Sequence, residues 1–134
     1  MEGENKGPVT ILIVEDEKIV AMDIAGSLKS VGYEISGIVS SGREAIELVK
    51  QNPPDLILMD IKIKGDIDGI QTAEIIQSHN DIPIVYLTAF ADENTLSRAR
   101  ITAPYGYIIK PFDKKTAHTL ESMLSLTLLS NGRV

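Results

Sequence analysis

The chain has 134 residues, of which 43% are hydrophobic and 24% are charged, so we expect one globular domain with its own core. It contains no cysteine, which excludes disulfides, thiolate metal sites and a cysteine nucleophile. The net charge of −6 argues against nucleic-acid binding, because phosphate contacts require clustered Lys and Arg. Since no apolar run approaches the roughly 20 residues that span a bilayer, and no signal peptide is evident, a cytoplasmic location is expected.

The first half of the chain alternates between strand patterns and helix patterns. Residues 1–8 are mostly polar, with two glycines, which predicts a flexible tail. Continuous apolar runs predict strands that are buried on both faces of a sheet, whereas apolar residues at intervals of three and four predict helices. We expect strands over 9–14, 33–40 and 55–60, a helix over 18–31, and a second helix between Gly42 and Asn52. Gly26, inside the first helix, predicts close packing of that helix on the sheet.

The second half continues the same alternation. We expect a polar loop over 62–69, helices over 69–78, 92–100 and 113–129, and strands over 84–88 and 105–109. Asn131 and Gly132 are expected to end the last helix. Strands that alternate with helices five times predict a three-layer α/β fold with five parallel strands and five helices. We therefore expect one domain over 9–130, and no output domain in this chain.

Five polar residues lie at or just past the carboxyl ends of predicted strands: Glu15, Asp16, Asp60, Thr88 and Lys110. The carboxyl ends of parallel strands meet at one edge, where open α/β sheets bind ligands. Three carboxylates repel one another there, and a divalent cation such as Mg²⁺, which prefers oxygen ligands and binds phosphate, would hold them together. Lys110 supplies a positive charge for a phosphate oxygen, and Thr88 supplies a hydroxyl donor. The set predicts an aspartate, Asp60, that accepts a phosphoryl group.

In combination, Glu15-Asp16, Asp60, Thr88-Ala89 and Lys110-Pro111 resemble the motifs of the receiver domain of two-component response regulators, the CheY-like family. The resemblance extends from about residue 9 to about residue 129. It implies a flavodoxin-like doubly wound sheet with the strand order 2-1-3-4-5.

By this resemblance, Asp60 is the phosphoacceptor, and a sensor histidine kinase or phosphotransfer protein supplies the phosphoryl group. Asp16 would bind Mg²⁺ directly, Glu15 would hold it through water, and the backbone carbonyl of Lys62 would be a further ligand. The domain would not be an enzyme in its own right, since it would take part only in its own phosphorylation and autodephosphorylation.

The resemblance also implies how the signal is read out. Thr88 and Lys110 would contact the phosphoryl group, and the Lys110–Pro111 peptide bond would be cis. Tyr107 matches the switch aromatic of the family, which turns inward as Thr88 shifts toward the phosphate. Taken alone, Tyr107 is equally a core or surface aromatic.

One stretch departs from the family pattern. Many receivers have a proline four residues after the phosphoacceptor and a glycine eight residues after it, whereas this chain has Lys64 and, nine residues after, Gly69. The loop is therefore expected to be one residue longer, with Gly65 in place of the rigid proline. Asp66 and Asp68 are interpreted first as turn residues, with tuning of the metal as the alternative.

Other residues carry simpler interpretations beside the functional ones. The run Glu15-Asp16-Glu17 is also typical of a helix amino terminus, and Glu17 is expected on the surface. His79 and His118 are expected to be exposed, without chemistry. The last helix carries more apolar residues than one buried stripe requires: Leu120, Met123, Leu124, Leu126, Leu128 and Leu129. They indicate either core packing or a partner surface, and a homodimer through the fourth helix, fifth strand and fifth helix is one possibility.

The leading hypothesis is a phosphorylation-switched signalling domain that acts through partner contact, either alone or as part of a longer protein. A flavodoxin-type flavin binder is an alternative, but the acidic residues 15–17 after the first strand would repel anionic FMN. A metal-dependent phosphatase with an Asp nucleophile is another, but Lys62 stands where a second acid is required. A pseudo-receiver that binds partners without phosphorylation is the last.

Overall fold

The computed structural model describes residues 7–89 and 92–130, and the side chains of these residues up to 124. Strands and helices alternate along the chain without exception in the described part. The elements are β1 (Thr10–Val14), α1 (Lys18–Ser30), β2 (Glu34–Val39), α2 (Gly42–Gln51), β3 (Leu56–Asp60), α3 (Gly69–Gln77), β4 (Ile84–Thr88), α4 (Glu93–Ile101), β5 (Gly106–Ile109) and α5 (Lys114–Ser130). Predicted and observed boundaries agree within one or two residues, and Asn131 and Gly132 lie outside the described residues.

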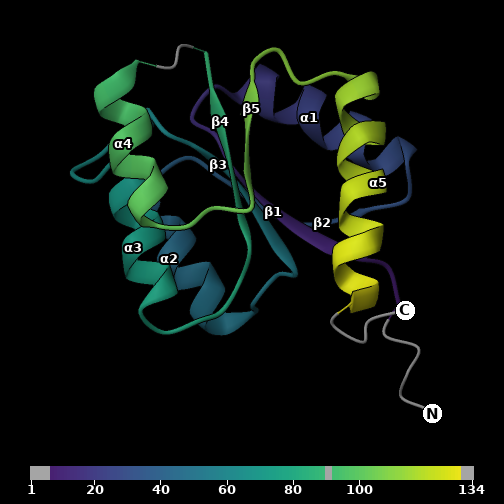
Figure 1. Cartoon of the computed structure of the whole chain (residues 1–134), viewed down its shortest axis with the longest axis horizontal. Helices are drawn as coiled ribbons and strands as arrows, with labels where there is room; N and C mark the ends of the chain where they lie inside the picture. The colour runs from purple at the N-terminus through teal and green to yellow at the C-terminus, as the bar shows by residue number, and fades with distance from the viewer. Residues whose placement is uncertain (1–6, 90–91, 131–134) are drawn as a thin grey trace.

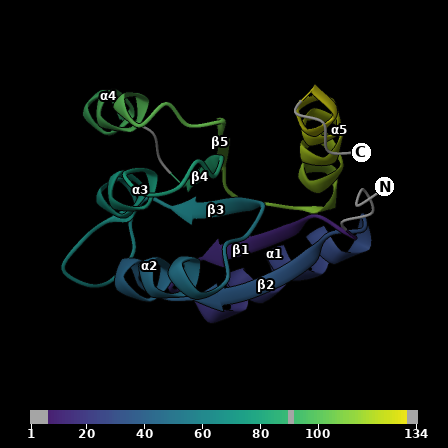
Figure 2. The same cartoon turned by 90° about the horizontal axis from the view of Figure 1, so that it is seen from below.

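The five strands form one sheet in the order β2-β1-β3-β4-β5, and every neighbouring pair is parallel. Helices α1 and α5 cover one face of this sheet, while α2, α3 and α4 cover the other (Figures 1 and 2). The predicted three-layer α/β fold with the order 2-1-3-4-5 is confirmed.

The central strands are apolar throughout because both of their faces are buried. Along β1, Ile11 and Ile13 belong to a core cluster with residues of α1 and α5, while Leu12 and Val14 belong to a second cluster with residues of α2 and α3. All five residues of β3 and of β4 are buried, whereas the edge strands β2 and β5 are only partly buried. A strand of this kind can place a polar residue only where it leaves the core, which is at its carboxyl end.

Side chains at the helix ends fix where the helices begin. The Ser41 hydroxyl accepts a hydrogen bond from the backbone N–H of Glu44 at the start of α2, and the Asp92 carboxylate accepts one from Thr95 at the start of α4. Gly32, with a φ of +103°, follows the end of α1. Within the described residues, no helix is both long enough and apolar enough to cross a membrane.

Two expectations about helix surfaces can be compared with the structure. The expected close packing at Gly26 is wrong, because this residue is exposed and a Cβ atom placed there would meet nothing within 4 Å. On α5, Leu120 and Leu124 are buried, while Met123 is 44% exposed; the side chains of Leu126, Leu128 and Leu129 lie outside the described part. His79 and His118 are exposed, as predicted.

Candidate functional site

The carboxyl ends of the strands bring the predicted residues to one edge of the sheet. A cavity of about 570 Å³ opens there, and it is lined by Asp16, Glu17, Asp60, Lys62, Lys64, Thr88, Ala89 and Lys110. Glu15 lies directly behind this cavity and is buried, and its backbone N–H donates to the carbonyl of Val39 at the end of β2 (3.0 Å). Residues from four separate parts of the chain therefore converge because the parallel topology ends all strands at this edge.

Lys110 joins two of the carboxylates. Its Nζ donates a hydrogen bond to Asp60 Oδ2 at 3.0 Å and lies 2.8 Å from Glu15 Oε1. The backbone N–H of Lys110 donates to the carbonyl of Thr88 (2.9 Å), and the following bond to Pro111 is cis, as the resemblance implied. Burial lowers the pKa of Lys110, but the contacts with Glu15 and Asp60 outweigh this effect, so that its pKa is raised and the ammonium stays charged.

Asp60 ends β3 with only 5% of its surface exposed. Its Oδ1 accepts a hydrogen bond from the backbone N–H of Lys62 (3.2 Å), and its Oδ2 accepts the bond from Lys110. Burial, together with the nearby charge of Glu15, raises the pKa of Asp60 to about 6, although the bonds from Lys110 and Lys62 act in the opposite direction. The environment of Asp60 therefore disfavours its negative charge, and a further cation nearby would stabilise that charge.

The donor set at this edge fits a hard divalent cation. Glu15, Asp16 and Asp60 each offer one carboxylate oxygen, and these oxygens lie within 4.8 Å of one another. Glu15 Oε1 is buried and lies 2.8 Å from Lys110 Nζ, whereas Asp16 makes neither a hydrogen bond nor an ion pair with the described residues. If Glu15 is counted with the residues that line the cavity, four carboxylates face three ammonium groups, and among these only the partly buried Lys110 forms ion pairs with the carboxylates, so an excess of negative charge remains. An all-oxygen set with this excess is what Mg²⁺ prefers.

The loop between β3 and α3 forms the opposite wall of the cavity. Lys64 pairs its backbone with Ser41 in an isolated parallel bridge, and Gly65 adopts a φ of +112°. Asp66 forms an ion pair with Arg43 (3.0 Å), so its carboxylate is engaged away from the cavity. The interpretation of Asp66 as a turn residue is therefore favoured over tuning of the metal.

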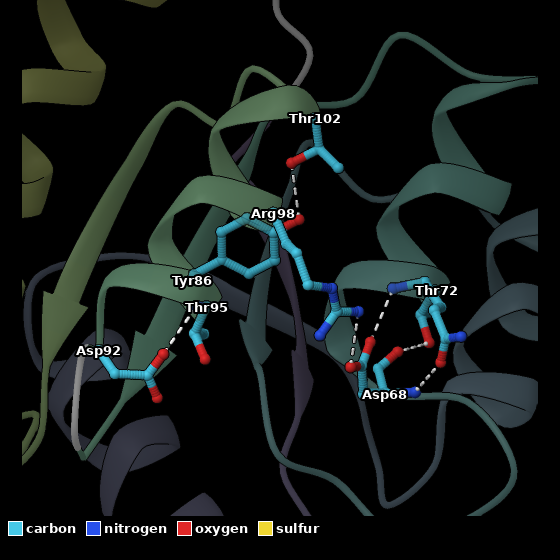
Figure 3. A network of polar contacts seen from close by, with 8 residues as sticks. Asp68, Thr72, Tyr86, Asp92, Thr95, Arg98 and Thr102 are labelled. Atoms are coloured by element: carbon cyan, nitrogen blue, oxygen red, sulfur yellow. Dashed lines mark hydrogen bonds and ion pairs between the residues drawn. The ribbon is translucent and has the colours of Figure 1, made fainter.

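A polar network links α3, β4 and α4 beside the site (Figure 3). Asp68 is the N-cap of α3, where its Oδ1 accepts from the backbone N–H of Gln71 (2.8 Å), and its Oδ2 accepts from Arg98 Nη2 of α4 (2.9 Å). The Tyr86 hydroxyl and Thr102 Oγ1 share a hydrogen bond of 2.7 Å. Both carboxylate oxygens of Asp68 are thus occupied by structural contacts.

Tyr107 lies on β5 with 38% of its surface exposed. Its ring stacks on that of Tyr86, with the centroids 6.1 Å apart. Burial raises the pKa of Tyr86 to about 12, so its hydroxyl stays protonated and can donate. In this structure, therefore, the predicted switch aromatic is partly exposed rather than turned inward.

Three features of the site were not predicted from the sequence. Glu17 was expected on the surface, and although it is exposed it also lines the cavity. Lys64 lines the cavity as well, and its only signal in the sequence was that it replaces an expected proline. The ion pair between Asp68 and Arg98 joins residues 30 positions apart, and no local pattern indicates such a contact.

Comparison with known proteins shows the family of the chain. The family model described as the response regulator receiver domain matches residues 11–120. The transcriptional regulatory protein PdtaR of Mycobacterium tuberculosis is 44% identical over 105 residues, which are 78% of this chain and 51% of that protein. ZraR of Escherichia coli is 33% identical over 121 residues, which are 89% of this chain and 27% of that protein. The chain thus spans about half or less of the length of these relatives.

Solved structures show the same fold. The N-terminal domain of a response regulator/sensory box/GGDEF protein from Carboxydothermus hydrogenoformans is 37% identical, with a TM-score of 0.80 over 91% of this chain and 98% of that one. The signal receiver domain of a modulated diguanylate cyclase from Desulfovibrio desulfuricans is 34% identical, with a TM-score of 0.80 over 87% of this chain and 92% of that one. The family model, the relatives and the fold agree, and the chain belongs to the response regulator receiver domains of two-component signalling systems.

Proposed function

We propose that the domain is switched by phosphorylation of Asp60, with a phosphohistidine of a sensor kinase or phosphotransfer protein as the donor. The observation that carries this proposal is the contact of Lys110 with both Asp60 and Glu15 at the mouth of a cavity lined by further carboxylates. The ammonium of Lys110 lies 3.0 Å from Asp60 Oδ2 and 2.8 Å from Glu15 Oε1. It is placed to neutralise the charge of a phosphoryl group on the adjacent aspartate.

Each residue of the site has a distinct task in this reaction. Asp60 attacks phosphorus through a carboxylate oxygen, a P–O bond forms as the donor P–N bond breaks, and the donor histidine leaves. Lys110 exchanges part of its contact with Asp60 for a phosphoryl oxygen, and the hydroxyl of Thr88 donates to another oxygen. Hydrolysis of the acyl phosphate by water would return Asp60 to its free state.

Mg²⁺ completes the site in this proposal. Asp16 and Asp60 would hold the ion directly, Glu15 through water, and the backbone carbonyl of Lys62 would be a further ligand. When bound, the ion supplies positive charge that offsets the repulsion between the carboxylates and the phosphoryl oxygens.

The output follows from changes on the adjacent surface. Thr88 and Tyr107 would act as the switch pair, and Tyr107 is partly exposed in the present arrangement. The face of α4, β5 and α5 presents Ile101, Ile109 and Met123 to solvent, which suits a homodimer or a downstream protein partner. A cytoplasmic location and a folded unit over residues 9–130 belong to the same proposal.

The test is the intact mass of the protein after incubation with acetyl phosphate, with and without Mg²⁺. We expect one added phosphoryl group on the wild type, dependent on Mg²⁺ and absent from Asp60→Asn. Asp66→Asn is the matched control, because it removes a neighbouring carboxylate that pairs with Arg43 instead of lining the cavity.

An adduct that persists in Asp60→Asn would contradict the assignment of the acceptor. If the wild type forms no adduct with acetyl phosphate or with phosphorylated kinases, the alternative holds, namely a domain that binds partners without phosphorylation.

A further inference from the structure

Helix α4 is attached to the rest of the domain mainly by polar contacts. Ala99 is the one buried residue of this helix in the described structure, whereas α3 buries five residues. The contacts that anchor it are the ion pair from Arg98 to Asp68 and, at its C-cap, the hydrogen bond between the Tyr86 hydroxyl and Thr102 Oγ1 (Figure 3). A helix with so little apolar burial is among the parts of a fold that shift at low cost.

The Asp68 end of the ion pair is fixed to the backbone around Asp60. Asp68 caps α3, and the next residue, Gly69, donates its N–H to the carbonyl of Ile61 at 2.8 Å. The approach is so close that a Cβ atom on Gly69 would lie 2.1 Å from the carbonyl oxygen of Asp60. The partner of Arg98 therefore sits on a rigid part of the site.

The other end of α4 is joined to the site through the chain. β4 ends at Thr88, and α4 begins five residues later, at Glu93. A shift of Thr88 toward a group on Asp60 would therefore displace the amino end of α4, while Arg98, in the last turn of the helix, holds the helix to Asp68. The connection to Thr88 would thus favour movement of α4, whereas the ion pair between Arg98 and Asp68 opposes it.

We propose that the ion pair between Arg98 and Asp68 is a latch that holds α4 against the start of α3 and opposes any displacement of α4 by the shift of Thr88. This inference rests on the proposed role of Asp60. The side chains are 49% and 31% exposed, so the latch is weak, and its loss is expected to change the equilibrium by roughly two- to fivefold. If a phosphoryl analogue binds better when α4 is released, linkage requires that loss of the latch strengthens the binding of the analogue by up to the same factor.

Two substitutions break the latch from opposite ends. Asp68→Asn keeps a side chain that caps a helix well but removes the charge, and Arg98→Gln removes the cation but keeps a good helix former. Arg100→Gln is the matched control, because Arg100 lies on the same helix and its ion pair, with Glu93 at 4.0 Å, stays within that helix. If the two residues act through each other, the double variant is expected to resemble either single variant.

The experiment combines two measurements on the full chain. Hydrogen exchange of the α4 amides, without ligand, reports whether the helix is held. Titration with beryllofluoride in the presence of Mg²⁺ reports the affinity for a phosphoryl analogue. In both latch variants we expect the α4 amides to exchange roughly two to five times faster and beryllofluoride to bind tighter by a similar factor, with Arg100→Gln unchanged.

Unchanged exchange in Arg98→Gln and Asp68→Asn would overturn the latch. Faster exchange with unchanged or weaker binding of beryllofluoride would show that the ion pair holds α4 but does not oppose the switch, and this also overturns the proposal. If the wild type itself binds no beryllofluoride, the proposed function of Asp60 fails together with the switching role of the latch. The exchange data then decide alone whether the ion pair holds the helix.

Discussion

The buried carboxyl of Asp60 is expected to destabilise the fold at neutral pH. Its pKa lies at about 6 in the folded chain, against an ordinary value of 3.8. One pKa unit corresponds to about 1.4 kcal/mol, so the shift lowers the free energy of unfolding by about 2–3 kcal/mol once the group is ionised in both states. Asp60→Asn, which replaces the carboxylate by a neutral group of the same shape, is expected to recover this amount.

The pH dependence follows from the direction of the shift. Below about pH 4 the carboxyl is protonated in both the folded and the unfolded chain, and the variant gains little. Between pH 4 and about 6 the unfolded chain loses the proton while the folded chain keeps it, so the wild type loses stability relative to Asp60→Asn. Above about pH 6 the difference is at its full size and constant.

The assay is urea denaturation of both proteins at pH 4, 5, 6 and 7.5, with EDTA present to exclude divalent cations. Asp66→Asn serves as the control, because Arg43 lowers the pKa of that exposed carboxyl and the variant is expected to gain nothing at neutral pH. The reasoning would be refuted if Asp60→Asn were no more stable than the wild type at pH 7.5, or if its gain were equal at pH 4 and pH 7.5.

Three further predictions concern the same edge of the sheet and two glycines. Mg²⁺ at about 100 times its dissociation constant is expected to stabilise the wild type by about 2.7 kcal/mol. The same concentration is expected to stabilise Asp16→Ala much less, and thermal melting of both proteins with and without Mg²⁺ measures the difference. Gly26→Ala is expected to stabilise the fold by about 0.5–1 kcal/mol, because the position is an exposed helix interior with open space. Gly69→Ala is expected to cost about 2 kcal/mol or more, because the new Cβ would meet the backbone of Asp60 and Ile61. Urea denaturation measures the free energy of unfolding of both variants. Similar changes from the two substitutions would contradict the difference in space around Gly26 and Gly69.

Much of the fold could be predicted because both faces of the central strands are buried. That requirement makes the sequences of β3 and β4 apolar without interruption, so the first polar residue after each run marks the edge of the sheet. The positions of Asp60 and Thr88 follow directly from this pattern. Lys110 was predictable for the same reason, although β5 is less buried than the central strands.

The parts that could not be predicted depend on contacts between distant segments. The sequence led to the interpretation of Asp68 as a turn residue; the structure shows that it caps α3, and nothing near it in the sequence indicates Arg98 as a partner. Gly26 shows the opposite failure, since a glycine inside a helix suggests close packing, whereas the position faces solvent. A residue type states which contacts are possible, and only the tertiary arrangement determines which of them form.

The charges at the site and the weak packing of α4 have a common consequence. The sheet edge buries the carboxylates of Glu15 and Asp60 against the ammonium of Lys110, an arrangement that is expected to destabilise the free domain. A cation or phosphoryl group that engages these residues therefore relieves an existing cost and has more free energy available to shift its surroundings. Helix α4, which lies beside the site, is held by the ion pair between Arg98 and Asp68. Because this pair is partly exposed, it is expected to favour the held position of α4 by only about twofold to fivefold, and a phosphoryl group can overcome that preference. A change of charge at Asp60 can therefore alter the position of α4, because the site is destabilised by its own charges and the helix is held by weak contacts.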